Sequence, residues 1–111
     1  MQYLILIYAP EADAAAHQHR MPEYIAITQQ LAQAGKLLSA EPLMPTTAAT
    51  SLRVRNGETL ITDGPFAETR EALGGYYLVD VANLDEALAI AKSLPAAEHG
   101  TIEVRPVRPR N

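Results

Sequence analysis

The chain has 111 residues, of which 48% are hydrophobic and 20% charged, with a formal net charge of −4 and no cysteine. This length and composition are typical of one globular domain, so we expect residues 1–111 to form a single domain. The lack of cysteine excludes disulfides, thiolate metal sites and cysteine nucleophiles.

The charge pattern and the apolar runs also restrict the partners. Non-specific nucleic-acid binding needs clustered cations, and a net negative chain with dispersed acids argues against it. The one basic cluster, Arg105–Arg110, is expected to be a solvated tail. No apolar run approaches the roughly 20 residues that a membrane-spanning helix needs, and neither a basic leader nor a cleavage site precedes the first apolar run. We therefore expect a cytoplasmic protein that binds neither nucleic acid nor a membrane.

The first half of the chain is predicted to form a strand, a helix and a strand. Residues 3–8 are apolar at both alternating sets of positions, which is typical of a strand covered on both faces. Residues 9–20 are polar and rich in alanine and are expected to form a loop or a loose helical turn. A helix is predicted to start at Met21, since Pro22 suits a first turn, and to end near Gly35. Its apolar face is the set Tyr24, Ile27, Thr28 and Leu31. Residues 36–41 read as a short strand.

The second half begins with a hairpin signal. Asn56-Gly57 is the pair favoured in type I′ turns, and it separates the β-prone runs 52–55 and 58–62. A strand is expected at 76–81. Asn83 followed by Glu86 resembles a capping box and predicts a helix start. The inward stripe of this second helix is expected to be Leu84, Ala87, Leu88 and Ala91. The helix should end before Pro95, and the last strand is predicted at 102–105.

The order of these elements predicts an α+β fold. With the hairpin set aside, two β-α-β units remain, which is the split, ferredoxin-like pattern with an antiparallel sheet and both helices on one face. Two helices cover only one face of the sheet, yet the strands at 3–8 and 76–81 are apolar on both. A second copy of the same sheet is the simplest cover for the other face, so we expect a homodimer.

Four stretches of the sequence carry a resemblance to a known family: 1–8, 62–71, 73–78 and 102–106. In order and spacing they resemble the YCII-related family, in its DGPF-domain branch. The resemblance covers nearly the whole chain. It implies a ferredoxin-like fold that dimerises into an α+β barrel. It implies no defined reaction, because most of that branch has none assigned.

The wider family resembled here is suspected of acid–base chemistry through a histidine on the first helix and an aspartate before a proline after the second. In this chain Tyr24 stands in the histidine's place and Leu94 in the aspartate's. A leucine can neither orient a base nor hold a charge, so that mechanism is not expected to carry over. A tyrosine could donate a proton or a hydrogen bond, but it is a poor base because its ordinary pKa is about 10.

The segment 62–69 is predicted to form a tight turn with specific backbone requirements. Asp63 is expected to accept a hydrogen bond from its own downstream backbone, Gly64 to allow a positive φ and Pro65 to fix its own φ. Phe66 is expected to anchor the turn in apolar surface, with Glu68 paired to Arg70 or capping a helical turn. Two interpretations stay open: a purely structural hinge, or a turn that brings Asp63 and Glu68 into a pocket against the first helix.

Histidines are the remaining candidates for chemistry. His17 and His19, with Glu23 nearby, could suggest a metal site, but they match no known ligand spacing and a solvated loop is the favoured interpretation. His99 is expected to be a surface residue. No metal and no cofactor is therefore expected.

Three functions remain compatible with the sequence. The leading hypothesis is a small-molecule-binding homodimer with a pocket between the first helix and the sheet. The expected ligand-binding residues are Tyr24, Glu41, Asp63, Phe66, Glu68 and Arg70. The first alternative is a cofactor-free enzyme for proton transfer or elimination on a small cyclic or aromatic substrate, with Asp63 or Glu68 as base and Tyr24 as acid. The second, which the family resemblance implies, is a protein-interaction accessory of a sigma-factor system.

Overall fold

The computed structural model describes residues 1–110. The main sheet consists of β1 (Gln2–Ala9), β2 (Leu37–Pro42), β5 (Ala72–Asp80) and β6 (Thr101–Pro106). A separate hairpin consists of β3 (Thr50–Arg55) and β4 (Glu58–Asp63). The helices are α1 (Ala14–His19), α2 (Met21–Gln33) and α3 (Leu84–Ser93). Three 3-10 turns complete the chain: η1 (Glu11–Asp13), η2 (Thr46–Ala48) and η3 (Pro95–Glu98).

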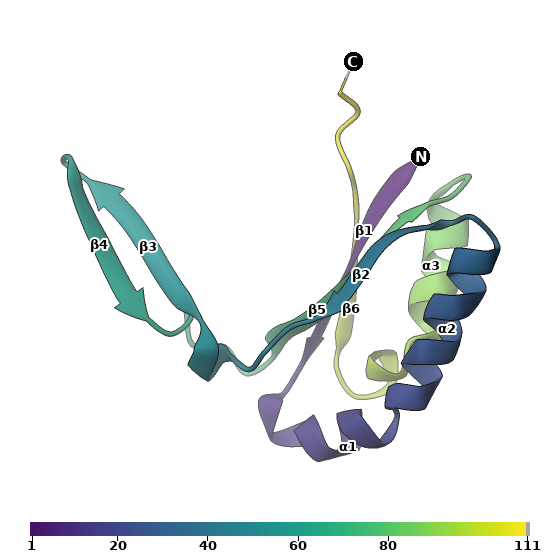
Figure 1. Ribbon diagram of the computed structural model, residues 1–111, viewed down its shortest axis with the longest axis horizontal. Coiled ribbons are helices and arrows are strands. Elements are labelled where there is room, and N and C mark those ends of the chain that lie inside the picture. Colours follow the sequence, from purple (N-terminus) through teal and green to yellow (C-terminus); the bar gives the residue numbers. More distant parts are fainter. Residues whose placement is uncertain (111) are drawn as a thin grey trace.

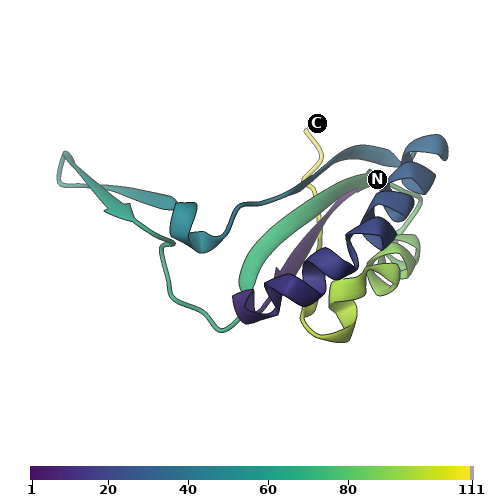
Figure 2. The same cartoon turned by 60° about the horizontal axis from the view of Figure 1, so that its bottom comes forward.

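The four-stranded sheet has the order β2-β5-β1-β6, and all its neighbouring strands are antiparallel. The α+β class, the antiparallel sheet and the inserted hairpin are thereby confirmed. Both long helices, α2 and α3, lie on one face of this sheet (Figure 2). Ile5 pairs with Tyr77 on one side and Val104 on the other, which places these three side chains on the helix-covered face.

The core lies between this face and the helices. Ile5 and Val79 of the sheet are 0% exposed, and Leu94, which follows α3, is 1% exposed. From α2 the core receives Tyr24 and Leu31, as the helical spacing predicted. Gly35 closes α2 with a φ of 72°, the left-handed conformation expected of its cap.

Residues 11–19 form η1 and α1, the helical alternative of the two offered for residues 9–20, because the alanines before His17 favour helix. One expectation about a helix is corrected. In α3, Leu84 and Leu88 are each 47% exposed, and the buried positions are Ala87 and Ala91. Leu88 lies about 100° around the helix from Ala87, and Leu84 is at the helix end, so neither faces the sheet.

The start of α3 agrees with the capping prediction. The Asn83 side chain accepts a hydrogen bond from the backbone N–H of Glu86 at 3.0 Å. The Glu86 carboxylate accepts from the backbone N–H of Ala82, one residue earlier than in a standard capping box. Asn83 therefore satisfies one of the free N–H groups at the helix N-terminus.

The hairpin of residues 50–63, called the arm below, projects away from the body of the molecule (Figure 1). Asn56 and Gly57 have φ angles of 52° and 79°, as a type I′ turn requires. Every arm residue except Ser51 is exposed, including Leu52 at 60% and Ile61 at 66%. The arm adds nothing to the core.

The second face of the main sheet carries no helix (Figure 2). Strand alternation places five apolar or aromatic side chains there, all of them only partly buried: Leu4, Leu6, Tyr8, Tyr76 and Leu78. We call this set the open face. Among residues 1–110, no helix is both long and apolar enough to cross a bilayer.

Candidate ligand-binding cavity

A cavity of about 290 Å³ lies between the helices α1 and α2 and the strands β2 and β5. Its wall is mostly apolar. The apolar and glycine members of the wall are Ile7, Met21, Ile25, Ala40, Pro42, Gly74 and Gly75. The polar and aromatic members are His17, Tyr24, Thr28, Gln29, Glu41, Tyr76 and Tyr77. Apolar walls with a few converging polar groups are typical of small-molecule sites.

Two hydroxyl groups meet at the wall. The Thr28 hydroxyl lies 2.9 Å from the Tyr77 hydroxyl and donates to the Tyr24 carbonyl oxygen at 2.8 Å. The Tyr77 hydroxyl also lies 3.3 Å from that carbonyl oxygen, as a donor. Burial raises the pKa of Tyr77, so its hydroxyl stays protonated at neutral pH. This pair can orient a ligand by hydrogen bonding without a charge.

Tyr24 belongs both to the core and to the cavity. Its side chain is buried, and its hydroxyl oxygen accepts a hydrogen bond from the Ala96 backbone N–H at 2.9 Å. Burial raises the pKa of Tyr24, so the phenol remains neutral at ordinary pH and offers no phenolate as a base. Leu94, which follows α3, is fully buried and belongs to the hydrophobic core. Both positions therefore belong to the packed core.

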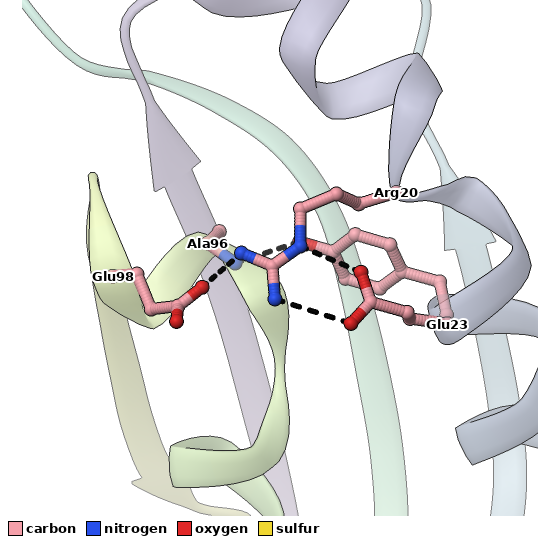
Figure 3. A network of polar contacts seen from close by, with 5 residues as sticks. Arg20, Glu23, Ala96 and Glu98 are labelled. Carbon is pink, nitrogen blue, oxygen red and sulfur yellow. Dashed lines mark hydrogen bonds and ion pairs between the residues drawn. The ribbon is translucent and has the colours of Figure 1, made fainter.

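A cluster of ion pairs around Arg20 lies at the junction of α1 and α2 (Figure 3). The Arg20 guanidinium donates to both carboxylate oxygens of Glu23, at 2.6 and 3.2 Å, and to the Glu98 carboxylate. Hydrogen bonds to Arg20 lower the pKa of Glu23, and hydrogen bonds to Glu23 and Glu98 raise that of Arg20. Since all three groups reach solvent, the cluster connects α2 to η3 but contributes little stability.

His17 and His99 come together beside Tyr24, which the sequence did not predict. The His17 ring lies 5.1 Å from the Tyr24 ring and 6.3 Å from the His99 ring, between centroids. Burial first, and the proximity of His99 second, lower the pKa of His17. His17 is half-buried instead of solvated, and His99 is half-buried rather than a plain surface residue.

A sequence signal for His17 does exist. His17, Met21, Tyr24 and Thr28 follow the spacing i, i+4, i+7 and i+11, and all four line the cavity. The stripe begins one turn before Met21, the residue at which the helix was expected to start. His99 has no comparable signal, because its position depends on η3 packing under α2.

A second hollow of about 440 Å³ adjoins the cavity and shares part of its wall with it. The shared residues are Ile7, His17, Met21, Pro42 and Gly74. Glu11 and Asp13 also line it, and hydrogen bonds from Thr46 lower the pKa of Glu11. His17 therefore lines both the mostly apolar cavity and the adjoining hollow that contains Glu11 and Asp13.

Of the sequence-predicted site residues, Tyr24 and Glu41 line the cavity. Asp63, Phe66, Glu68 and Arg70 do not line it in a single chain: all four are exposed and lie at or after the end of β4. Within residues 1–110 Glu68 and Arg70 form no ion pair, so that expected pairing is corrected.

The turn at Asp63-Gly64-Pro65 is held differently from the expectation. Gly64 has a φ of 106°, as predicted for a glycine-dependent turn. Its N–H donates to the Ala49 carbonyl at 2.7 Å, and its carbonyl accepts from the Ser51 hydroxyl at 2.8 Å. These bonds, rather than the Asp63 side chain, fix the turn. Phe66 is 82% exposed and anchors nothing within the chain, which corrects the expectation that it would be buried.

The structure contains no group of three metal-binding side chains within residues 1–110. His19 is exposed on α1, and the Glu23 carboxylate is bound to Arg20. His17, His19 and Glu23 therefore do not converge.

The fold and the cavity define a small α+β protein with a lined, mostly apolar chamber under its first helices. A model of the YCII-related domain matches residues 1–111, so the chain belongs to the YCII-related domain family. It is also 44% identical, over 114 aligned residues, to an uncharacterized protein of Rhizobium meliloti (strain 1021). That alignment covers 96% of this chain and 92% of the relative.

Proposed function

We propose that the chain, as a member of the DGPF branch, is a small-molecule-binding protein that acts as a homodimer, with its ligand in the cavity between α1, α2 and the sheet. The observation that carries the proposal is the wall of that cavity: apolar surface combined with the hydroxyls of Thr28 and Tyr77. A volume of about 290 Å³ suits a small, compact ligand, at the low end of the range for such sites.

The homodimer part of the proposal is supported by the open face. It is an apolar surface on a central part of the sheet, where an unpaired monomer would expose it to water. Pairing two such faces around a two-fold axis covers both at once and yields the ferredoxin-like, dimeric α+β barrel expected from the sequence. Asp63, Phe66, Glu68 and Arg70 remain candidate ligand contacts only for a cavity that a second chain completes.

The binding proposal is tested by thermal shift with a panel of small aromatic and cyclic compounds, both acidic and neutral. Ile25 lines the cavity and is 51% exposed, so Ile25→Trp should fill it without disturbing the core. Ile61→Trp is the matched control, because Ile61 is 66% exposed on the arm. A compound that raises Tm in the wild type should lose its effect in Ile25→Trp and keep it in Ile61→Trp.

Two outcomes of that screen count against the proposal. Equal shifts in both tryptophan variants would move the site away from the cavity, and a panel without any effect on the wild type would remove the support for ligand binding. Loss of the shift in Asp63→Asn and Glu68→Gln would support a contribution of these residues from a second chain.

A protein-interaction role is the second candidate, and the arm favours it. Leu52, Val54 and Ile61 are each more than half exposed, and Phe66 beyond the arm is the most exposed large apolar side chain described. Apolar surface of this kind, away from the open face, is typical of sites that bind another protein. The acid–base enzyme alternative has less support, since neither Asp63 nor Glu68 lies at the cavity of its own chain.

A further inference from the structure

The two faces of the arm differ in polarity. Leu52 lies opposite Ile61 in the hairpin, and Val54 is two residues further along β3, so these three side chains share one face. All three are more than half exposed. Arg53 and its partner Leu60 lie on the other face. We call Leu52, Val54 and Ile61 the apolar face of the arm.

A hairpin of this kind needs a cover. Two strands alone are at best marginally stable in water, unless a further strand, a helix or another surface packs against them. Within residues 1–110 nothing covers the apolar face of the arm, since every arm residue except Ser51 is exposed. The cover for this face therefore has to come from outside the single chain.

The root of the arm is fixed to the body of the molecule. The Glu11 carboxylate of η1 accepts hydrogen bonds from the backbone N–H of Thr46 at 2.8 Å and from the Thr46 hydroxyl, and so holds η2, which precedes the arm. The Leu43 N–H donates to the Gly74 carbonyl oxygen at 2.9 Å. An element whose direction is set beforehand loses less entropy when it binds a partner.

The arm lies on the side of the main sheet that faces away from α2 and α3 (Figures 1 and 2). This is also the side of the open face. A second chain that packs its open face against this one occupies the same side of the sheet, so it comes to lie next to the arm. A two-fold axis then gives each chain the same contact with the arm of the other.

The exposed area of the single chain fits a partner of this size. The chain exposes 7900 Å², whereas a compact monomer of 111 residues exposes about 6,000 Å². Its Cα radius of gyration is 15.8 Å, against about 13 Å for a compact domain of this length. The surplus of about 1,900 Å² is more than the roughly 800 Å² that each partner buries in a standard interface, and it lies in the range of permanent dimers. The open face cannot supply it alone, because its five side chains are already partly buried.

We propose that the arm is a dimerisation element: each arm packs its apolar face against the partner chain, beside the paired open faces. This inference rests on the homodimer of the proposed function. It gives the apolar face of the arm a second copy of this chain as its partner, in place of an unrelated protein. The opposite face, with Arg53 and Leu60, stays in water.

Analytical ultracentrifugation of lysine variants tests the contact through the Kd of the dimer. Leu52→Lys and Ile61→Lys should each raise the Kd by at least about tenfold, because each replaces a large buried apolar side chain by a charge. Leu60→Lys is the matched control, since Leu60 is 47% exposed on the other face of the same arm. It should change the Kd by no more than about twofold, as expected of a surface substitution. Far-UV circular dichroism should be the same for all three variants, because the arm adds nothing to the core.

A dimer assembled from isotope-labelled and unlabelled chains reports the contact directly. The methyl groups of Leu52 and Ile61 should show nuclear Overhauser effects to protons of the partner chain, and those of Leu60 should show none.

Three results would contradict this role of the arm. A wild-type dimer whose Kd is unchanged in Leu52→Lys and Ile61→Lys, or that lacks the inter-chain effects at both residues, would overturn the inference alone and leave the apolar face to another protein. An equal rise of the Kd in Leu60→Lys would overturn the assignment of the contact to one face. A wild type that is monomeric at micromolar concentration would contradict the homodimer of the proposed function as well.

Discussion

The hydroxyl oxygen of Tyr24 accepts a hydrogen bond from the backbone N–H of Ala96 at 2.9 Å, which ties α2 to the 3-10 turn η3. Both residues are buried, so neither group could use water as an alternative partner. The bond fixes the wall of the cavity and the turn that carries His99.

Tyr24→Phe is expected to lower the free energy of unfolding by about 1–3 kcal/mol, the usual cost of a buried donor without a partner. Urea denaturation followed by circular dichroism measures it. Tyr76→Phe is the matched control: it removes a hydroxyl that bonds to Ser39 in a partly buried position and should cost less. Equal costs would show that the Ala96 bond has no special weight.

Much of the fold was predictable because its signals are local. The turn at Asn56-Gly57, the cap at Asn83 and the left-handed Gly35 each follow from the chemistry of one or two residues. The inward stripe of α3 was partly wrong, since apolar spacing alone does not reveal that small alanines, and not Leu84 and Leu88, lie against the sheet.

The cavity was only partly predictable. Tyr24 and Glu41 were found, because they lie on predicted elements that flank the same edge of the sheet. His17 was missed because it belongs to a short helix before the expected start, and His99 because its place depends on long-range packing. Asp63, Phe66, Glu68 and Arg70 were expected at the site because of their residue types. They lie at or after the end of the arm, and the sequence did not reveal that this places them away from the cavity of their own chain.

Gly100→Ala is expected to destabilise the protein, because an added Cβ would overlap the backbone carbonyl oxygen of Tyr8. Overpacking of this kind typically costs about 1–3 kcal/mol. At Gly74 an added Cβ would meet only the Ile7 carbonyl oxygen at 4.0 Å, so Gly74→Ala should be nearly neutral in the same urea experiment. Comparable losses at both glycines would contradict the tight approach of η3 to β1.

Leu6→Arg should convert the proposed dimer into a monomer, because it places a charge in the centre of the open face. Light scattering coupled to size exclusion would give twice the chain mass for the wild type and one chain mass for the variant. Leu88→Arg is the control, since Leu88 is 47% exposed on α3 and outside that face. A monomeric wild type at micromolar concentration would contradict the homodimer.

His17 gives stability a defined pH dependence. Its pKa is lowered in the folded state, so below the ordinary value of 6.5 the unfolded chain binds more protons than the folded one. The free energy of unfolding should therefore fall as pH drops through 6.5, and His17→Asn should reduce this fall. His19→Asn should leave it unchanged. An identical pH profile for wild type and His17→Asn, from urea midpoints, would contradict the burial of this imidazole.

Amide chemical shifts map the ligand on the protein and so test the proposed cavity site most directly. The probe is the compound of the thermal-shift panel that raises Tm most. The largest shift changes are expected at the cavity wall, at Thr28, Gln29, Glu41 and Gly75, with little change at Leu52 on the arm. Changes confined to the arm or to the open face, with the cavity wall unaffected, would contradict it.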